Sequence, residues 1–287
     1  MNIGIYTYGT RGDLQPYIAL ALGLMENGHR VTISATGDFA GLVEGFGVPF
    51  EPLAGDAEAV MNSEEGQRVL DLYCISPSLI PQPKDWEAHH KITGFFNIPK
   101  EKRVSHEMDV VSPELEAWLG AGPEPIYFGF GSNGVGQSEK FVNIIRALLA
   151  KGERILFCTG WSIFENIPQH QNLYTTKYVN HEAVFPQCKV GIFHGGAGTM
   201  ATMLRNHLPM IIVSFYTDQP TWGKIVERRG LGVHIPAKKL TLERLIAAIK
   251  RCQTDEVKRN VAAVGEAIVA ERGLEKTIEE IENYFNR

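Results

Sequence analysis

Short apolar runs alternate with helical stretches over the second half of the chain, and this alternation constrains the fold more than any other feature. The runs are four or five residues long: Ile126–Phe130, Arg154–Cys158, Leu173–Thr176, Val190–Phe193, Met210–Ser214 and Gly232–Ile235. Successive strands separated by helices pair in parallel, because each return connection needs a crossover. The sequence therefore predicts a doubly wound α/β domain with a six-stranded parallel sheet over residues 113–270.

The first hundred residues begin in the same way, with a strand, a helix and a strand. Apolar residues from Leu14 to Met25 follow helical spacing, and four apolar runs predict short strands: Ile3–Tyr6, Val31–Ser34, Leu72–Ser76 and Ile92–Phe96. We expect a smaller Rossmann-like domain over residues 1–98, with a sheet of about four strands. Residues 99–112 are polar and lack periodicity, which indicates a linker. Residues 271–287 predict a final amphipathic helix.

The bulk properties are those of an ordinary globular protein, with 44% hydrophobic and 21% charged residues. A net charge of −5 argues against general nucleic-acid binding, which usually requires a basic face. The four cysteines are scattered without metal-like spacing and indicate reduced, buried thiols. The N-terminus is typical of a first strand rather than of a signal peptide, and no run has the length of a membrane span. We expect a cytoplasmic protein, with peripheral membrane contact left open.

A glycine-rich turn follows the strand run Val190–Phe193 and precedes a helix. Glycines let backbone N–H groups approach an anion, and a helix N-terminus adds a favourable potential. The turn matches neither the dinucleotide fingerprint nor the P-loop. It predicts a phosphate site built from His194, Gly196, Ala197, Gly198 and Thr199. The alternative is a tight turn whose glycines serve packing alone and whose histidine is structural.

A second polar pair follows the next strand run. Asp218 and Gln219 come just after Met210–Phe215, at the carboxyl edge where open α/β sheets bind ligands. An acid beside an amide can form paired hydrogen bonds with neighbouring sugar hydroxyls. These two residues are therefore candidates for sugar binding.

Together these residues resemble a known donor-binding signature. His194–Thr199, with Asp218-Gln219-Pro220-x-Trp222-Gly223, is similar to the signature of the family 1 and family 28 type glycosyltransferases, and most to the sterol and antibiotic-aglycone glucosyltransferases. Gly9–Pro16 resembles their first-loop motif. The resemblance implies the GT-B architecture, in which two Rossmann-like domains face a cleft. It also implies inverting transfer of a hexose, glucose above all, from a UDP-sugar to a hydroxyl of a lipophilic acceptor, without a metal or other cofactor.

The resemblance adds further candidate residues: Ser132 against the diphosphate, Trp161 stacked on the uracil, Val179 reading the base edge through its backbone, Asp13 as the general base, and Thr10 and Gly12 in the first loop. A base is needed because a neutral alcohol is a poor nucleophile. Two alternatives stay open here. Trp161 is equally suited to a core position, and Asp13 is suited to capping the helix that follows it.

One departure separates this chain from the family. Pro49–Leu53 is followed almost at once by Leu72–Pro77, so roughly a hundred residues that line the acceptor pocket are absent, about one small domain. An exposed apolar flank would then favour a homodimer or a partner protein. Two other functions remain open: a nucleotide-sugar-binding protein without catalysis, and a UDP-sugar hydrolase or epimerase on the same scaffold.

Overall fold

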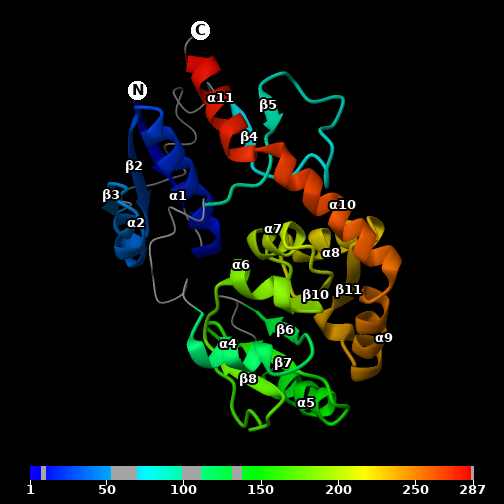
Figure 1. The fold of residues 1–287 in the computed structure, drawn as a ribbon. Helices are drawn as coiled ribbons and strands as arrows, with labels where there is room; N and C mark the ends of the chain where they lie inside the picture. The colour runs from blue at the N-terminus through cyan, green and yellow to red at the C-terminus, as the bar shows by residue number, and fades with distance from the viewer. Residues whose placement is uncertain (8–10, 53–69, 99–110, 131–137, 286–287) are drawn as a thin grey trace. The chain divides into compact units, whose positions relative to one another are not determined.

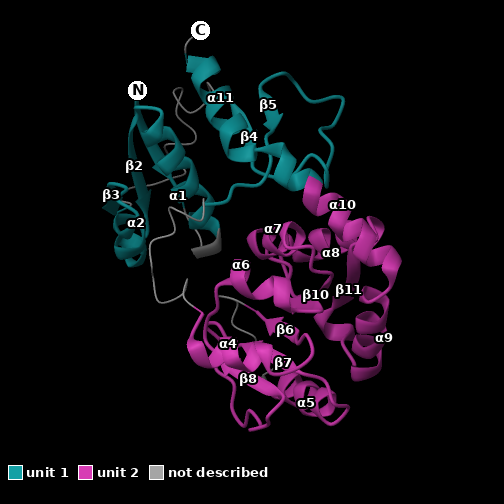
Figure 2. Ribbon diagram, in the orientation of Figure 1, with its two compact units in different colours: residues 1–104, 267–287 teal, residues 105–266 magenta. Residues whose placement is uncertain are grey.

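The computed structural model describes residues 1–7, 11–52, 70–98, 111–130 and 138–285. The chain divides into two compact units (Figure 2). Unit 1 comprises residues 1–104 and 267–287, and unit 2 comprises residues 105–266. Each unit has its own hydrophobic core.

Unit 2 is built on a six-stranded parallel sheet, as the alternation predicts (Figure 1). Its strands are β6 (Ile126–Gly129), β7 (Ile155–Cys158), β8 (Leu173–Thr176), β9 (Val190–Phe193), β10 (Met210–Ser214) and β11 (Gly232–Pro236). Their order across the sheet is β8-β7-β6-β9-β10-β11. The chain therefore adds strands outward from β6 in one direction and then, from β9, in the other. This is the doubly wound order of Rossmann-like domains.

The strands of unit 2 are apolar because the sheet is covered on both faces. Every residue of β6, β7, β9 and β10 is buried. Phe128 lies in van der Waals range of Phe130, Phe141 and Phe157, with ring centroids 5.4–6.0 Å apart. The helices and short helical turns of unit 2 are α4 (Pro113–Gly120), α5 (Ser138–Leu149), α6 (His181–Val184), η4 (Phe185–Gln187), α7 (Ala197–Arg205), α8 (Gln219–Arg228), η5 (Ala237–Lys239) and α9 (Leu242–Cys252).

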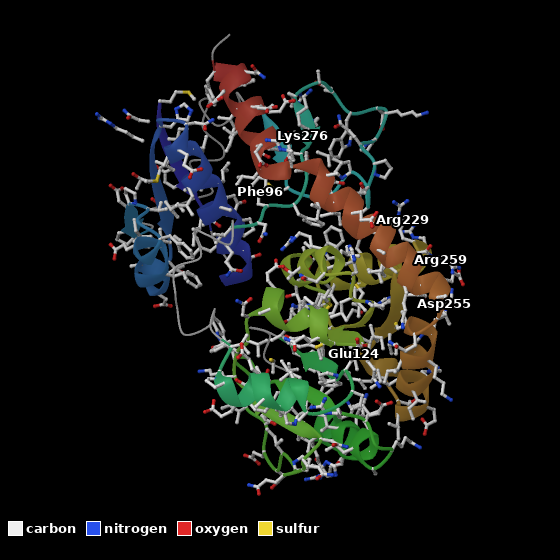
Figure 3. All side chains as sticks on the ribbon, in the orientation of Figure 1. Phe96, Glu124, Arg229, Asp255, Arg259 and Lys276 are labelled. Atoms are coloured by element: carbon white, nitrogen blue, oxygen red, sulfur yellow. The ribbon has the colours of Figure 1, made fainter. Side chains whose placement is uncertain are left out.

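Unit 1 has a smaller parallel sheet of β1 (Asn2–Tyr6), β2 (Arg30–Ala35) and β3 (Phe50–Pro52). Its helical elements are α1 (Arg11–Glu26), η1 (Gly37–Phe39), α2 (Ala40–Gly45) and α11 (Gly273–Phe285). The C-terminal helix α11 packs on α1, and the two meet closely at Gly23, where an added Cβ would lie 2.5 Å from Cδ1 of Ile278. Phe96, labelled in Figure 3, is buried in the same core.

The expected four-stranded sheet in unit 1 is wrong. The described strands form the sheet β1-β2-β3 and a separate pair, β4 (Asp71–Tyr73) with β5 (His90–Ile92). Residue Asp71 is in register with His90 in this parallel pair. A strand of three residues is too short to show a clear alternation of apolar and polar residues, so its pairing partner cannot be predicted from the sequence.

Helix α10 (Asp255–Glu271) contributes residues to both units (Figure 2). Among the described residues, no helix combines the length and the apolar character that crossing a membrane requires. Cys158, Cys188 and Cys252 are buried thiols, as expected, whereas Cys74 is only half-buried. Burial raises the pKa of Cys158 to about 12.

We expect Phe157→Ala to lower the free energy of unfolding by about 3–5 kcal/mol, because it leaves a cavity beneath β7. Phe157 is fully buried, and its ring centroid lies 4.8 Å from that of Phe164. Urea denaturation followed by tryptophan fluorescence measures the change. Ile163→Ala is the matched control, since this side chain is 84% exposed. Equal stability of the two variants would contradict this description of the core.

Candidate functional site

The candidate site lies where the strand order of unit 2 reverses, between β6 and β9. These strands are paired in register, with Ile126 beside Val190 and Phe128 beside Ile192. In an open parallel sheet the connections leave the two central strands toward opposite faces, which opens a crevice at their carboxyl ends. The turn after β9 carries His194. Ser132, which follows β6 in the sequence, lies outside the described residues.

The turn after β9 requires its glycines. Gly195 has a φ of +101°, and an added Cβ would lie 2.8 Å from Cγ2 of Ile212. Gly196 passes under the imidazole of His194, where an added Cβ would lie 2.6 Å from Nε2. A side chain at either position would displace the turn from the strand end. These glycines are therefore required for packing, and the close turn brings the N-terminus of the following helix to the same edge of the sheet.

The N-terminus of α7 presents backbone donors at this edge that precede the first hydrogen bond of the helix. The helix begins at Ala197, and the N–H of Met200 is bonded to the carbonyl of Gly196 at 3.0 Å. The N–H groups of Ala197, Gly198 and Thr199 therefore precede the first helical bond. Gly196, the N-cap, has no side chain to accept from them, and Gly198 is exposed. Oriented N–H groups and the helix dipole favour an anion here.

His194 adds a buried polar atom beside this helix end. Its Nδ1 is buried and meets no hydrogen-bond partner in the part of the chain that the structure describes. Burial lowers the pKa of His194 from 6.5 to about 4, and the carboxylate of Asp218 opposes this effect in part. The imidazole is therefore neutral at pH 7, with one N–H to donate. It can therefore donate a hydrogen bond to an anion but carries no positive charge to offset that of the anion.

Asp218 and Gln219 stand at the start of α8, after β10, the neighbour of β9. Gln219 is buried, and its Oε1 accepts the N–H of Phe215 at 2.8 Å. Asp218 is exposed, and its Oδ2 accepts the indole N–H of Trp222 at 2.8 Å. An added Cβ on Gly195 would lie 3.5 Å from Cβ of Gln219, so the two turns are in contact.

Sequence reasoning missed the role of Trp222, which fixes the direction of the Asp218 carboxylate. A hint was available, because residues four apart on a helix share a face. It also missed His234, whose Nε2 lies 2.8 Å from Oγ of Ser214 and whose ring occupies the space beside Gly223. The contact explains the glycine in that position.

The turns after β7 and β8 carry the candidate base-binding residues. Trp161 is 53% exposed, so the alternative that it belongs to the core is wrong. The N–H of Gly160 donates to the carbonyl of Lys177 at 3.1 Å, which ties the turn before Trp161 to the one before Val179. Val179 is half-buried and precedes Asn180, whose side chain caps α6.

The first-loop candidates belong to unit 1. Thr10 lies outside the described residues, and Gly12 is the second residue of α1. Asp13 is exposed in the first turn of α1, inside the helix, so the interpretation of Asp13 as its N-cap is wrong. Tyr17 stands one turn further on; burial, the nearby thiol of Cys74 and the carboxylate of Asp13 raise the pKa of its hydroxyl.

Two family profiles match the two halves of the chain. The glycosyltransferase family 28 N-terminal domain matches residues 3–80. The C-terminal domain of erythromycin biosynthesis protein CIII-like proteins matches residues 161–277. The chain belongs to the family 1/family 28 glycosyltransferases. The sterol 3-beta-glucosyltransferase UGT80A2 of Arabidopsis thaliana is 35% identical over 212 residues, which are 73% of this chain and 32% of that protein. The chain thus spans about a third of the length of this relative.

Solved glycosyltransferases share the fold of this family member over nearly its whole length. The glycotransferase of kitacinnamycin gives a TM-score of 0.75 at 18% identity, covering 99% of this chain and 98% of that one. Glycosyltransferase VinC, solved in complex with dTDP, gives 0.68 at 14% identity, covering 99% of each chain. The GT-B fold, with a doubly wound sheet in unit 2, is therefore confirmed.

We expect the imidazole of His194 in this family member to titrate near pH 4. NMR of the imidazole Cε1–H groups measures this titration, and His194→Gln should remove the resonance. The unfolded chain takes up this proton near pH 6.5, so the native state loses stability as pH falls from about 6.5 to 4 and gains nothing from the group above that range. His194→Gln should spare the protein about 2 kcal/mol of that loss at pH 5. A titration near pH 6.5 would contradict the burial of the ring.

Proposed function

We propose that this protein binds a UDP-hexose, with glucose as the favoured sugar, and transfers the hexose to a hydroxyl of a lipophilic acceptor with inversion. One observation carries the proposal. The carboxyl ends of β9 and β10 bring together the N-terminus of α7, the buried Nδ1 of His194 and the oriented carboxylate of Asp218. The hydrogen-bond donors suit the diphosphate, and the polar pair beside them suits sugar hydroxyls. One nucleotide-sugar ligand fits both.

The diphosphate gains negative charge as the anomeric C–O bond breaks. The backbone N–H groups at the start of α7 are fixed before the reaction, so they need no reorganisation to stabilise that charge. The neutral His194 ring contributes one hydrogen bond. In this proposal the helix terminus supplies the positive potential that leaving-group departure needs, without a requirement for a metal ion.

The hexose is held by the start of α8. Trp222 and Thr217 both donate to Asp218, at 2.8 and 3.0 Å, which leaves the carboxylate with remaining lone pairs in a fixed direction. The Oε1 of Gln219 is used by the N–H of Phe215, so its amide nitrogen is the group suited to a sugar hydroxyl. Sugar recognition thus combines one acceptor with one donor. Trp161 supplies an exposed ring for the base.

Transfer with inversion is a single displacement. The acceptor oxygen forms a bond to the anomeric carbon, the bond from that carbon to the diphosphate oxygen breaks, and Asp13 takes the acceptor proton. Asp13 is exposed and suited to this role by its position in the first turn of α1, directly after Gly12. The similarity to a sterol glucosyltransferase supports a lipophilic acceptor.

A dTDP-sugar is the second candidate donor, since a structural neighbour was solved in complex with dTDP. The decisive assay measures UDP release from UDP-glucose by the full chain, with and without a panel of lipophilic alcohols, and repeats it with dTDP-glucose. Release that rises with an acceptor and yields its glycoside supports the transferase. Release without acceptor would show hydrolysis, and binding without release would show a nucleotide-sugar-binding protein.

We expect Asp13→Asn to lower transfer to an alcohol acceptor by about 100-fold or more, because the amide cannot accept the hydroxyl proton. UDP binding, measured by calorimetry, should be unchanged, since Asp13 belongs to unit 1 and the diphosphate residues to unit 2. Asp38→Asn is the matched control, an acidic residue of unit 1 in η1. Full activity in Asp13→Asn would remove this carboxylate from the base role.

A further inference from the structure

Unit 1 contains a cluster of metal-ligating side chains far in sequence from the donor-site residues. Asp71 begins β4, His90 begins β5, and His89 comes directly before it. We propose that Asp71, His89 and His90 form a binding site for a divalent transition-metal ion of the zinc class. This proposal is independent of the proposed transfer reaction, which uses none of these residues.

The distances suit such an ion. One ligand atom from each of the three residues lies within 4.8 Å of the other two. Oδ2 of Asp71 is 2.8 Å from Nδ1 of His90 and 3.9 Å from Nε2 of His89. A tetrahedral zinc ion with bonds of about 2.0–2.2 Å holds its ligand atoms about 3.3–3.6 Å apart. The observed separations bracket this range, so small side-chain rotations would complete the geometry.

The backbone explains why two adjacent histidines face the same point. Neighbouring residues of a regular strand project to opposite faces. Here the N–H of His90 bonds to the carbonyl of Glu87 at 3.1 Å, which closes a turn that ends where β5 begins. His89 is therefore a turn residue, and its ring centroid lies 4.0 Å from that of His90. The register of the strand pair places Asp71 directly beside His90.

Surrounding groups orient both imidazoles. Oε2 of Glu87 lies 3.4 Å from Nδ1 of His89, which leaves Nε2 of that ring directed toward Asp71. A carboxylate on the second nitrogen is the usual companion of a metal-binding histidine, because it fixes the tautomer and raises ligand basicity. The ring of Trp86 packs against His90, with centroids 5.4 Å apart. Gln82 donates to the backbone carbonyl of His90 at 3.0 Å and so holds the start of β5.

The donor set and its exposure select the class of ion. Two imidazoles and one carboxylate suit Zn²⁺, Ni²⁺ or Cu²⁺, whereas Mg²⁺ and Ca²⁺ prefer sites made of oxygen alone. The three side chains are 27–40% exposed, so an ion can enter from solvent. Three protein ligands leave one tetrahedral position for water. The ion would join two strands of three residues each, a small sheet to which a cross-link adds stability.

Calorimetric titration of Zn²⁺ into the full chain, stripped with a chelator and free of a histidine tag, tests the proposal. We expect one ion per chain, no heat with Mg²⁺, and a rise in melting temperature with Zn²⁺. His89→Ala and His90→Ala should each weaken binding at least tenfold. Glu87→Gln should weaken binding by about 10–100-fold, as is typical when a metal-binding histidine loses the carboxylate that hydrogen-bonds its second ring nitrogen. His170→Ala, an exposed histidine of unit 2, is the matched control and should bind as the parent does.

Absence of a one-to-one Zn²⁺ isotherm would overturn the proposal and leave an ordinary cluster of ion pairs. An equal loss of binding in His170→Ala and His89→Ala would overturn it too, because it would show nonspecific capture by surface histidines. If His90→Ala fails to fold, judged by circular dichroism, Glu87→Gln decides, since the Glu87 side chain is 80% exposed and we expect its substitution to preserve the fold.

Discussion

The pairing of β6 with β9 is the constraint on which the rest of unit 2 depends. Along the chain, β6 and β9 are the first and the fourth strand of this sheet. Each of the other strands is added outward on the side of one of these two. Their register is fixed by buried apolar residues on both sides, since a slip by one residue would turn every side chain to the opposite face. The strand order alone, before any polar residue is considered, makes their carboxyl ends the point at which open parallel sheets bind ligands.

Two features at this edge of the sheet are energetically unfavourable, and the packing of the surrounding strands offsets their free-energy cost. Thr217 has a φ of +55°, unfavourable for a β-branched residue, and Nδ1 of His194 is buried without a partner among the described residues. Such features persist only where surrounding structure holds them, and they gather at functional sites. Here the neighbours are the strands β9 and β10, whose residues are all buried. The buried strands thus hold this turn in place, as the proposed anion site requires.

Much of unit 2 is predictable from sequence because local and long-range signals agree. The six strands begin and end within one residue of their predicted positions, since glycine, proline or polar residues bound most of the apolar runs. The order of the strands follows from the crossover rules. The positions of the glycine turn and of the Asp218–Gln219 pair follow in turn. The exposure of Trp161 excludes the core position that the sequence had left open for it.

Other features depend on contacts that no local pattern records. The indole N–H of Trp222 fixes Asp218, and the ring of His234 fills the space beside Gly223. Burial, opposed in part by Asp218, lowers the pKa of His194. In unit 1, the three-residue strands β4 and β5 pair with each other and place Asp71 beside His90, a juxtaposition invisible at a separation of nineteen residues. Short elements are decided by tertiary contacts rather than by propensity.

The most direct test of the central claim is the response of the His194 imidazole to UDP, followed by NMR of its Cε1–H group with calorimetry on the same sample. A diphosphate at the N-terminus of α7 should shift this resonance and raise the pKa of His194 above its value of about 4, because an adjacent anion favours the protonated ring. UDP binding seen by calorimetry, with no change in either the resonance or its pKa, would place the nucleotide elsewhere and contradict the account.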